Sequence, residues 1–556
     1  DRIWEVVLVG ASGTGVPVSA AEDDDAAGVG RLAKGALVRQ LAPPSGSRHS
    51  RGRRLQFCKI TGVGPESGWV TTSLKEKDFL VRTYDVRPER LLAAADVGAP
   101  LTMPADGRRP FDIIIYGASG FTGSLAAEHL DALVASRAPA GRAVSWAIAG
   151  RSAAKLRPLE QRCRTRPTVF QAESPQDLTK LAALCRVLVA AAGPYQLFGE
   201  PLVQACIEQG THYVDVTGEV LWVRDIIGKY HATARQKGVM VVHCAGQVCA
   251  IDEMICYMLA KKLGPLRQFR EYFTQFGGMT GGTVATNIAT LQGTTPDACR
   301  ILSDPFSLGG QRKCGVRPED QDCQAAAQDA LFPALWLQPA YSSATASRVI
   351  RRSCHLFEET AQDGVSYGDG VSVVIREGAL SQRAAEMQAM SLRQPDPAVA
   401  SAAAQQLGLQ VSKGEQPQPG QGPPPETRGL YYSDAYGVGE SERGDWAHVH
   451  YTGPEAYEAT AMCCVTAALC LVEEVDRLRP SSRGGVLTPA YALHGSTFLD
   501  RLQDASFGLG AGRKMRFELM EGKPPETALR DVVMEKTKKA SIGQDDIAQG
   551  RRKAFA

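Results

Sequence analysis

The sequence lacks several features that would mark a specialised class of protein. Its 62 Lys and Arg residues nearly balance 60 Asp and Glu residues, and the net charge of +2 gives no sign of a nucleic-acid partner. The longest apolar run, residues 459–472, is shorter than the ~20 residues that span a bilayer, so we expect a buried helix and no transmembrane segment. None of the 14 cysteines lies in a CxxC pair or at a Cys/His spacing typical of zinc, which predicts buried thiols in a reducing compartment and no metal site.

The chain is long and apolar enough to form several folded parts. Its 556 residues, 44% of them hydrophobic, indicate about two to four domains. The sequence begins at Asp1 rather than Met, and it therefore leaves open a targeting segment further upstream.

The clearest local signal is a glycine-rich loop that follows an apolar strand. The segment FDIIIYGASGFTG at 111–123 runs from a strand into three spaced glycines, and Ala and Leu at helical spacing follow at 124–136. This order is typical of the strand, turn and helix N-terminus that bind a dinucleotide pyrophosphate. The loop alone is a weak signal, because a strand ending in a flexible turn has the same composition. The residues expected to bind the cofactor in this loop are Gly117, Ser119, Gly120, Phe121, Thr122 and Gly123.

Strands and helices alternate from residue 111 to residue 243, which predicts an α/β fold with a doubly wound parallel sheet. The second strand ends at Arg151 and Ser152, where NAD enzymes commonly place an acidic residue. Because a guanidinium suits a 2′-phosphate, we expect NADP rather than NAD; a solvated charge at the strand end is the alternative. After a later strand, Gly193 and Pro194 are expected to lie beside the nicotinamide ribose.

Candidate acid and base residues follow the same strand ends. Hydride transfer needs one proton donor or acceptor near the substrate, and the candidates are Tyr195, Asp215 and Glu219. Tyr195 could instead pack on the nicotinamide, and Asp215 could instead cap a turn. A basic trio at positions 348, 351 and 352 could bind a carboxylate or phosphate, although such a run more often forms a solvated face.

The remaining segments are expected to add accessory parts. Residues 1–54 repeat the strand and the GASG loop but lose the helix, so we interpret them as a partial Rossmann-like duplicate followed by a basic linker. Residues 55–84 alternate β-branched and aromatic runs with turns and resemble SH3-like modules, which bind or decorate rather than catalyse. We also expect a linker at 85–110, a disordered Pro- and Gln-rich insertion at 395–426 and a charged tail at 516–556.

Four segments of the expected Rossmann domain carry a family resemblance: YGASGFTG (116–123), WAIAGRS (146–152), AAGPYQLFGEPLVQAC (191–206) and GTHYVDVTGE (210–219). With further matches as far as residue 515, they resemble the saccharopine dehydrogenase-like oxidoreductases. Within that family the likeness is to the branch of trans-acting enoyl reductases and animal lipid-droplet-associated proteins. The resemblance implies a Rossmann domain at 111–245 and a mixed α/β domain at 246–515 that closes over the nicotinamide.

Three functions are compatible with the residues and the resemblance. The first is an NADP-dependent oxidoreductase that reduces a carbonyl, imine or enoyl group of a lipid or acyl-type intermediate. The second is a cofactor-binding protein without turnover, in a lipid-surface or structural role. It is favoured because residues 246–252 depart from the CGFDSIPSD segment usual in the family. The third, saccharopine chemistry in lysine metabolism, ranks last because no dense Arg/Lys set lies near the strand ends.

The partners and the location follow from the same resemblance. We expect a small-molecule or lipid-like substrate and a cytoplasmic protein. The sequence leaves open association with a membrane or lipid-droplet surface and homo-oligomerisation. It also leaves open the identity of the substrate and the role of the SH3-like module.

Overall fold

The computed structural model divides the chain into two compact units, residues 1–97 and 98–556. In the first unit the structure describes the strands between residues 3 and 83. In the second unit it describes residues 99, 101–103 and 107–536, apart from gaps at 138–143, 312–314, 323, 361–363, 369, 393–395, 429–430, 479–483 and 508–513.

The first unit is an antiparallel sheet. Its strands lie in the order β3-β2-β6-β5-β4-β1-β8, and β7 pairs with β6. The strands are β1 (Ile3–Val6), β2 (Val16–Ser19), β3 (Gly28–Leu32), β4 (Leu37–Gln40), β5 (Arg53–Thr61), β6 (Ser67–Leu74), β7 (Lys77–Asp78) and β8 (Leu80–Thr83).

The single sheet differs from the two separate parts that were expected on either side of residue 54. β1 pairs with β8 and with β4, and β4 pairs with β5, so strands of the expected duplicate and of the expected SH3-like module share one sheet. Both neighbours of β1 are antiparallel, whereas a Rossmann strand has parallel ones. Pro17, which is unsuited to a helix interior, lies in β2 instead. The loop at Gly10–Gly15 lies outside the described residues.

The second unit begins with the doubly wound parallel sheet that the sequence predicts. Its order is β11-β10-β9-β12-β13-β14-β20, and every neighbouring pair is parallel. Three consecutive isoleucines of β9 are almost fully buried, because neighbouring strands and helices cover both faces of the sheet. The strands are β9 (Phe111–Tyr116), β10 (Trp146–Gly150), β11 (Thr168–Gln171), β12 (Cys185–Ala190), β13 (His212–Asp215), β14 (Met240–Val242) and β20 (Gly485–Leu487). The helices between them are α2 (Phe121–Arg137), α3 (Ala153–Arg162), α4 (Pro175–Ala183), α5 (Tyr195–Phe198), α6 (Glu200–Gln209) and α7 (Val220–Gln236).

A mixed sheet forms the core of the second half of this unit. Its order is β16-β17-β15-β18-β19-β21, in which only β15 and β17 run parallel. The strands are β15 (Leu266–Phe276), β16 (Trp336–Pro339), β17 (Ser372–Ala379), β18 (Tyr432–Ser441), β19 (Trp446–Gly453) and β21 (Arg516–Glu521). The helices are α8 (Gln247–Leu263), α9 (Gly281–Gln292), α10 (Pro296–Leu302), η1 (Pro318–Asp320), α11 (Ser343–Glu359), α12 (Gln382–Ser391), α13 (Pro397–Ser412), α14 (Pro425–Arg428), α15 (Ala456–Glu473), α16 (Pro489–Ala492) and α17 (Phe498–Asp504).

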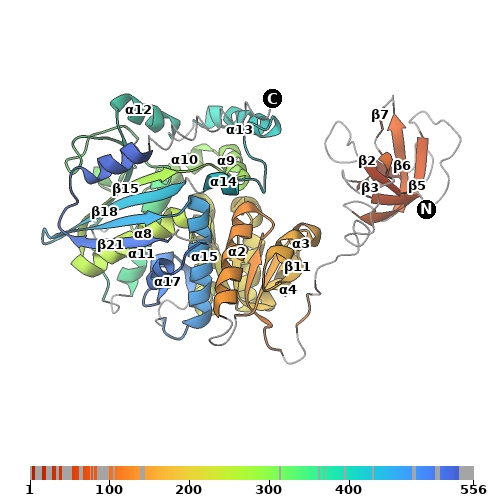
Figure 1. Cartoon of the computed structure of the whole chain (residues 1–556), viewed down its shortest axis with the longest axis horizontal. Coiled ribbons are helices and arrows are strands. Elements are labelled where there is room, and N and C mark those ends of the chain that lie inside the picture. Colours follow the sequence, from red (N-terminus) through yellow and green to blue (C-terminus); the bar gives the residue numbers. More distant parts are fainter. Residues whose placement is uncertain are drawn as a thin grey trace. The chain divides into compact units, whose positions relative to one another are not determined.

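Helix α15 joins the two sheets of the second unit. It contacts α2, β12 and β13 on one side and α8 on the other, and Figure 1 shows it running beside α2. Among the described residues it is the one helix with the length and composition to cross a membrane, yet 83% of its apolar window is buried in the protein. The expectation of a buried helix at residues 459–472 is therefore confirmed.

The insertion expected to be disordered, residues 395–426, contains ordered structure. Residues 397–412 form α13, and the Asp396 carboxylate caps it by accepting a hydrogen bond from the N–H of Ala398 at 2.8 Å. Further on, the carbonyl of Gln421 accepts a hydrogen bond from the N–H of Gly281 at 2.9 Å. The alanines of the first half favour a helix, and this outweighs the Pro- and Gln-rich composition of the second half.

Part of the segment expected to be a charged tail is folded. Residues 516–521 are strand β21, which pairs with β19. Leu529 and Val533 then pack in a small core with Leu335, and Lys536 pairs with Glu377. Residues 537–556 lie outside the described part of the chain.

Candidate active site

Two glycines of the loop after β9 are packed so tightly that neither position has room for a side chain. Gly117 has φ +84°, and a Cβ there would lie 2.8 Å from the carbonyl carbon of Ala191. A Cβ on Gly123 would lie 2.3 Å from the carbonyl oxygen of Gly117. The loop leads directly into the N-terminus of α2, whose N–H groups and dipole favour a phosphate. The backbone therefore fits the pyrophosphate of a dinucleotide.

The end of the next strand, β10, offers a cation rather than a carboxylate. Arg151 is exposed, and its guanidinium carbon lies 5.7 Å from the ring centroid of Phe198. Ser152 follows as the first residue before α3. The two loops adjoin, since a Cβ on Gly150 would lie 3.9 Å from the Ser119 hydroxyl oxygen. This arrangement suits a ribose that carries a 2′-phosphate.

The second half of the unit meets the same edge of the parallel sheet. A Cβ on Gly193, after β12, would lie 3.6 Å from the Thr286 hydroxyl oxygen of α9. At the start of α11, the Thr345 hydroxyl donates a hydrogen bond to the carbonyl of Gly218 at 3.2 Å. Helices α9 and α11 thus approach the carboxyl ends of β12 and β13, where ligands of doubly wound sheets bind.

The three predicted acid–base residues lie close together, but the fold already uses their polar atoms. The Tyr195 hydroxyl donates to the carbonyl of Ala190 at 2.8 Å. The two Glu219 oxygens accept from the N–H groups of Tyr195 and Gln196, each at 2.8 Å. Burial raises the pKa of Glu219 and holds that of Tyr195 well above its usual range. These bonds stabilise the start of α5, and the catalytic roles of Tyr195, Asp215 and Glu219 stay predictions.

Asp215 has a histidine partner that the sequence did not indicate. Its carboxylate lies 2.7 Å from His243 Nδ1, and both side chains are buried. The same carboxylate accepts hydrogen bonds from the N–H groups of Thr217 and Cys244, each at 3.2 Å. Since Asp215 ends β13 and His243 follows β14, their position after adjacent strands was the signal that could have paired them.

The atypical segment 244–252 is buried beneath α15. Cys244 and Cys249 adopt positive φ angles of 61° and 85°. The N–H of Gln247 donates to the Thr460 hydroxyl of α15 at 3.1 Å. Burial raises the pKa of Asp252, and the N–H of Cys249 donates to its carboxylate at 2.8 Å. The segment joins the two sheets and does not present an open set of polar groups.

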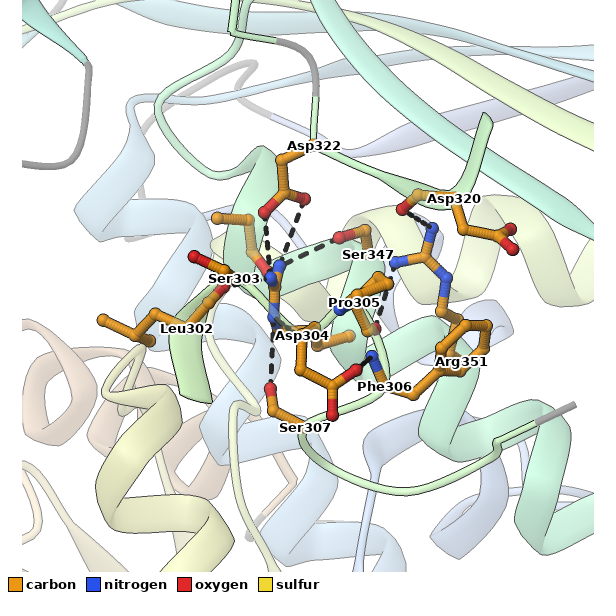
Figure 2. Close-up of polar contacts among 12 residues, drawn as sticks. Leu302, Ser303, Asp304, Pro305, Phe306, Ser307, Asp320, Asp322, Ser347 and Arg351 are labelled. Atoms are coloured by element: carbon orange, nitrogen blue, oxygen red, sulfur yellow. Dashed lines mark hydrogen bonds and ion pairs between the residues drawn. The ribbon is translucent and has the colours of Figure 1, made fainter. Parts of the chain in front are cut away.

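The basic trio lies on α11 and is neither a solvated face nor an open anion site. Arg348 is 1% exposed and makes two bonds to the Asp322 carboxylate, at 3.1 and 2.9 Å (Figure 2). Arg351 donates to the carbonyls of Pro305 and Asp320, at 3.2 and 3.0 Å. Arg352, also buried, donates to the carbonyl of Val486 in β20. All three side chains fasten neighbouring segments to α11.

A group of hydroxyl side chains beside the glycine-rich loop was also missed. The Tyr457 ring of α15 packs edge-on against Phe121, with centroids 5.7 Å apart. Its hydroxyl oxygen accepts a hydrogen bond from the N–H of Thr280 at 3.0 Å and lies 2.7 Å from the Thr283 hydroxyl oxygen. Thr283 and Thr286 are at helical spacing in the sequence, which was the available signal. Among the described residues, no cluster of three or more His, Cys, Asp or Glu side chains could hold a metal ion.

Comparison with known proteins agrees with this geometry. Residues 113–242 match the family model of the saccharopine dehydrogenase NADP-binding domain. A candidate trans-acting enoyl reductase of Mycobacterium tuberculosis is 31% identical over 426 residues, covering 73% of this chain and 98% of the relative. A trans-acting enoyl reductase of Mycobacterium bovis is 29% identical over 434 residues, covering 73% and 98% of the two chains. Apo saccharopine dehydrogenase of Saccharomyces cerevisiae aligns with a TM-score of 0.40 and 11% identity, over 74% of this chain and 100% of its own. The chain belongs to the saccharopine dehydrogenase-like family, as an NADP-dependent oxidoreductase with the family's NADP-binding domain at residues 113–242.

Proposed function

We propose that the protein uses NADPH to reduce the activated carbon–carbon double bond of an enoyl group on an acyl-type substrate. The observation that carries this proposal is a set of large apolar side chains left exposed on the segments that meet the carboxyl edge of the parallel sheet. They lie on α5, just before α9 and just before α11, and they are Leu197 (60% exposed), Phe198 (54%), Met279 (45%) and Tyr341 (59%). The names of the two mycobacterial relatives point to the same chemistry.

Three of these apolar side chains, Leu197, Phe198 and Tyr341, lie near Gly193. The Tyr341 hydroxyl donates to the Asn287 side chain of α9 at 3.2 Å, and Thr286 beside it faces Gly193. Leu197 and Phe198 follow Gly193 within five residues. Exposed apolar patches of this kind commonly mark ligand sites, and an acyl chain would cover this one.

The chain's own residues supply binding and orientation. Gly117, Gly120 and Gly123 would let the backbone approach the pyrophosphate of the cofactor, and the Arg151 guanidinium would suit its 2′-phosphate. NADPH, when bound, supplies a hydride to the substrate. Thr286 and Gly193, which approach each other across the edge of the sheet, would hold the nicotinamide end and limit access of water to it.

A screen of NADPH consumption tests this function. We expect consumption with trans-2-enoyl thioesters, more rapid with long acyl chains than with the four-carbon thioester. Matched ketones and imines of equal chain length serve as the competing substrates. Consumption of a ketone or imine alone would replace the enoyl assignment with one of those reductions.

The second candidate is a cofactor-binding protein without turnover. It is favoured by segment 244–252, which is buried under α15 and offers no open polar groups to a substrate. NADPH binding by calorimetry without consumption of any substrate would support it. Saccharopine chemistry is disfavoured, since the three arginines of α11 that could have bound substrate carboxylates are buried and bonded within the fold.

Association with a lipid surface is a separate proposal. It is compatible with an acyl-type substrate and with exposed methionines on α12, Met387 and Met390. Flotation of the protein with neutral and anionic liposomes tests it, and a protein that stays at the bottom of both gradients would contradict it.

A further inference from the structure

We infer that the Tyr457 hydroxyl is the proton donor of the reduction, and that Thr280 and Thr283 stabilise the phenolate that remains after the transfer. This inference rests on the proposed function, and it assigns the second chemical step to a residue outside the NADP-binding domain.

The position of Tyr457 is fixed by the packing of two helices. It is the second residue of α15, and its ring lies edge-on to Phe121, the first residue of α2, at 5.7 Å. The Glu455 carboxylate caps α15 by accepting from the N–H groups of Tyr457 and Glu458, at 2.9 and 3.1 Å. The phenol is therefore held at the end of the glycine-rich loop.

One arrangement of the hydrogen bonds around this phenol leaves its proton available. Its oxygen accepts from the N–H of Thr280 at 3.0 Å. When the Thr283 hydroxyl, 2.7 Å away, also donates to it, the Tyr457 O–H has no acceptor among these partners and can point to a substrate. The two donors then face the oxygen on which negative charge appears once the proton leaves.

Helix α9 connects this phenol to the nicotinamide end of the site. Thr283 bonds to Tyr457, and Thr286, three residues later on the same helix, faces Gly193. Three residues of α-helix span about 4.5 Å, which is within the reach of one substrate functional group. The phenol and the loop expected to hold the nicotinamide ribose thus flank the same short stretch of α9.

Two helix N-termini lie beside the partners of this phenol. Helix α2 begins at Phe121, which packs on the Tyr457 ring, and α9 begins directly after Thr280. Each N-terminus carries a partial positive charge that stabilises a nearby anion. The Arg428 guanidinium of the same neighbourhood is balanced by the Glu458 carboxylate at 3.8 Å.

In the proposed step the proton of Tyr457 completes the reduction of the double bond. Hydride addition at the β-carbon of the enoyl thioester places the electron pair of the double bond on the enolate. The O–H bond of Tyr457 then breaks and a C–H bond forms at the α-carbon, giving the saturated thioester. The Tyr457 phenolate accepts hydrogen bonds from Thr280 and Thr283 until water returns the proton.

The test compares Tyr457→Phe with Tyr230→Phe, a matched control on α7 whose hydroxyl bonds to Glu200. We expect Tyr457→Phe to lower kcat for a trans-2-enoyl thioester by about 100- to 1,000-fold. The NADPH dissociation constant, the thermal unfolding midpoint and KM should stay close to the wild-type values. Tyr230→Phe should retain wild-type kcat, and the solvent deuterium isotope effect on kcat should be altered by Tyr457→Phe alone.

A second pair of variants separates catalysis from structure. Thr283→Val removes the donor to the phenol and should lower kcat by about tenfold, whereas Thr283→Ser keeps a hydroxyl and should restore it. Wild-type turnover with an unchanged kcat in Tyr457→Phe would overturn this inference and leave the proposed function intact. NADPH binding by the wild type without any turnover would overturn both.

Discussion

The Arg151 guanidinium lies over the ring of Phe198, with 5.7 Å between its central carbon and the ring centroid. The residue that follows β10 thereby lies against α5, the short helix that follows β12, although 47 positions separate the two in the sequence. This distance is within the range of a cation–π contact, and both residues follow carboxyl ends of strands of the parallel sheet.

Replacing this arginine should change cofactor preference. We expect Arg151→Ala to weaken NADPH binding by about 10- to 100-fold, because charge-assisted hydrogen bonds to the 2′-phosphate are lost, and to leave NADH binding nearly unchanged. Calorimetry with both cofactors measures this. Arg162→Ala, which removes an exposed arginine paired with Glu128 on α3 and α2, is the control. Equal weakening of both cofactors would contradict the role in 2′-phosphate binding.

Two glycine-to-alanine variants should act on different properties. One should weaken NADPH binding, and the other should stabilise the fold. In Gly123→Ala the new Cβ would lie 2.3 Å from the Gly117 oxygen, so the loop must shift, and NADPH affinity should fall more than tenfold. Gly228 lies within α7 with no atom within 4 Å of a Cβ, so Gly228→Ala should raise the free energy of unfolding by about 0.5–1 kcal/mol. Calorimetry and chemical denaturation of both variants check the pair, and unaltered NADPH affinity in Gly123→Ala would refute the tight-loop argument.

Buried Glu253 should make stability depend on pH. Burial raises its pKa to about 8, while its carboxyl accepts hydrogen bonds from the Ala490 N–H and the Ser353 hydroxyl. The folded state therefore keeps a proton that the unfolded chain releases near pH 4.5, and the free energy of unfolding falls as pH rises through this window. Between pH 6 and 8 the loss should be about 2 kcal/mol.

Glu253→Gln resembles the protonated carboxyl and should remove this part of the dependence. Denaturant unfolding at pH 6 and pH 8 in both proteins gives the comparison. The difference between the two slopes isolates Glu253 from other buried carboxyls whose pKa is raised, such as Asp252 and Glu271. Parallel slopes in the two proteins would show that Glu253 is ionised throughout.

The ion pair of Arg348 and Asp322 should be costly to break from one side. Arg348→Met leaves Asp322 without its guanidinium partner and several carbonyls without their donor. We therefore expect the free energy of unfolding to fall by about 3–5 kcal/mol. Asp322→Asn should lower the free energy of unfolding by less. The decrease in the double variant should be smaller than the sum of the decreases in the two single variants. Urea unfolding of the three variants measures the coupling, while NADPH affinity of Asp322→Asn should match the wild type. Strict additivity would mean that the pair contributes nothing to stability.

The sequence predicted placements that depend on local order. A strand that runs into spaced glycines has few alternatives, and parallel strands bring their carboxyl ends to one edge, so Gly117 and Gly193 were expected at the strand ends where the structure places them. Their contacts with a cofactor stay predictions. Tyr457 was not identified, because its bond to Thr280 spans 177 positions and links two helices that no local pattern pairs.

Two expectations that rested on residue composition were wrong. The arginines of α11 carry charge, and charge on a helix usually indicates a solvated face, but Asp322 and the carbonyls near Pro305 compensate them inside the protein. Likewise, the Pro- and Gln-rich composition near residues 416–425 suggested disorder over the whole insertion. The preceding alanines form α13, and Gly281 anchors the segment that follows it.

The parallel sheet is completed by residues far along the chain, since β20 at 485–487 supplies the strand next to β14 at 240–242. During synthesis, six strands of the nucleotide-binding sheet leave the ribosome more than 240 residues before the seventh. Until then, the outer N–H and C=O groups of β14 lack their β20 partners. An exposed strand edge of this kind is a template for aggregation. A chain truncated before residue 485 would keep every expected cofactor-binding residue and still leave this edge open, so its yield in soluble form should fall before its affinity for NADPH does.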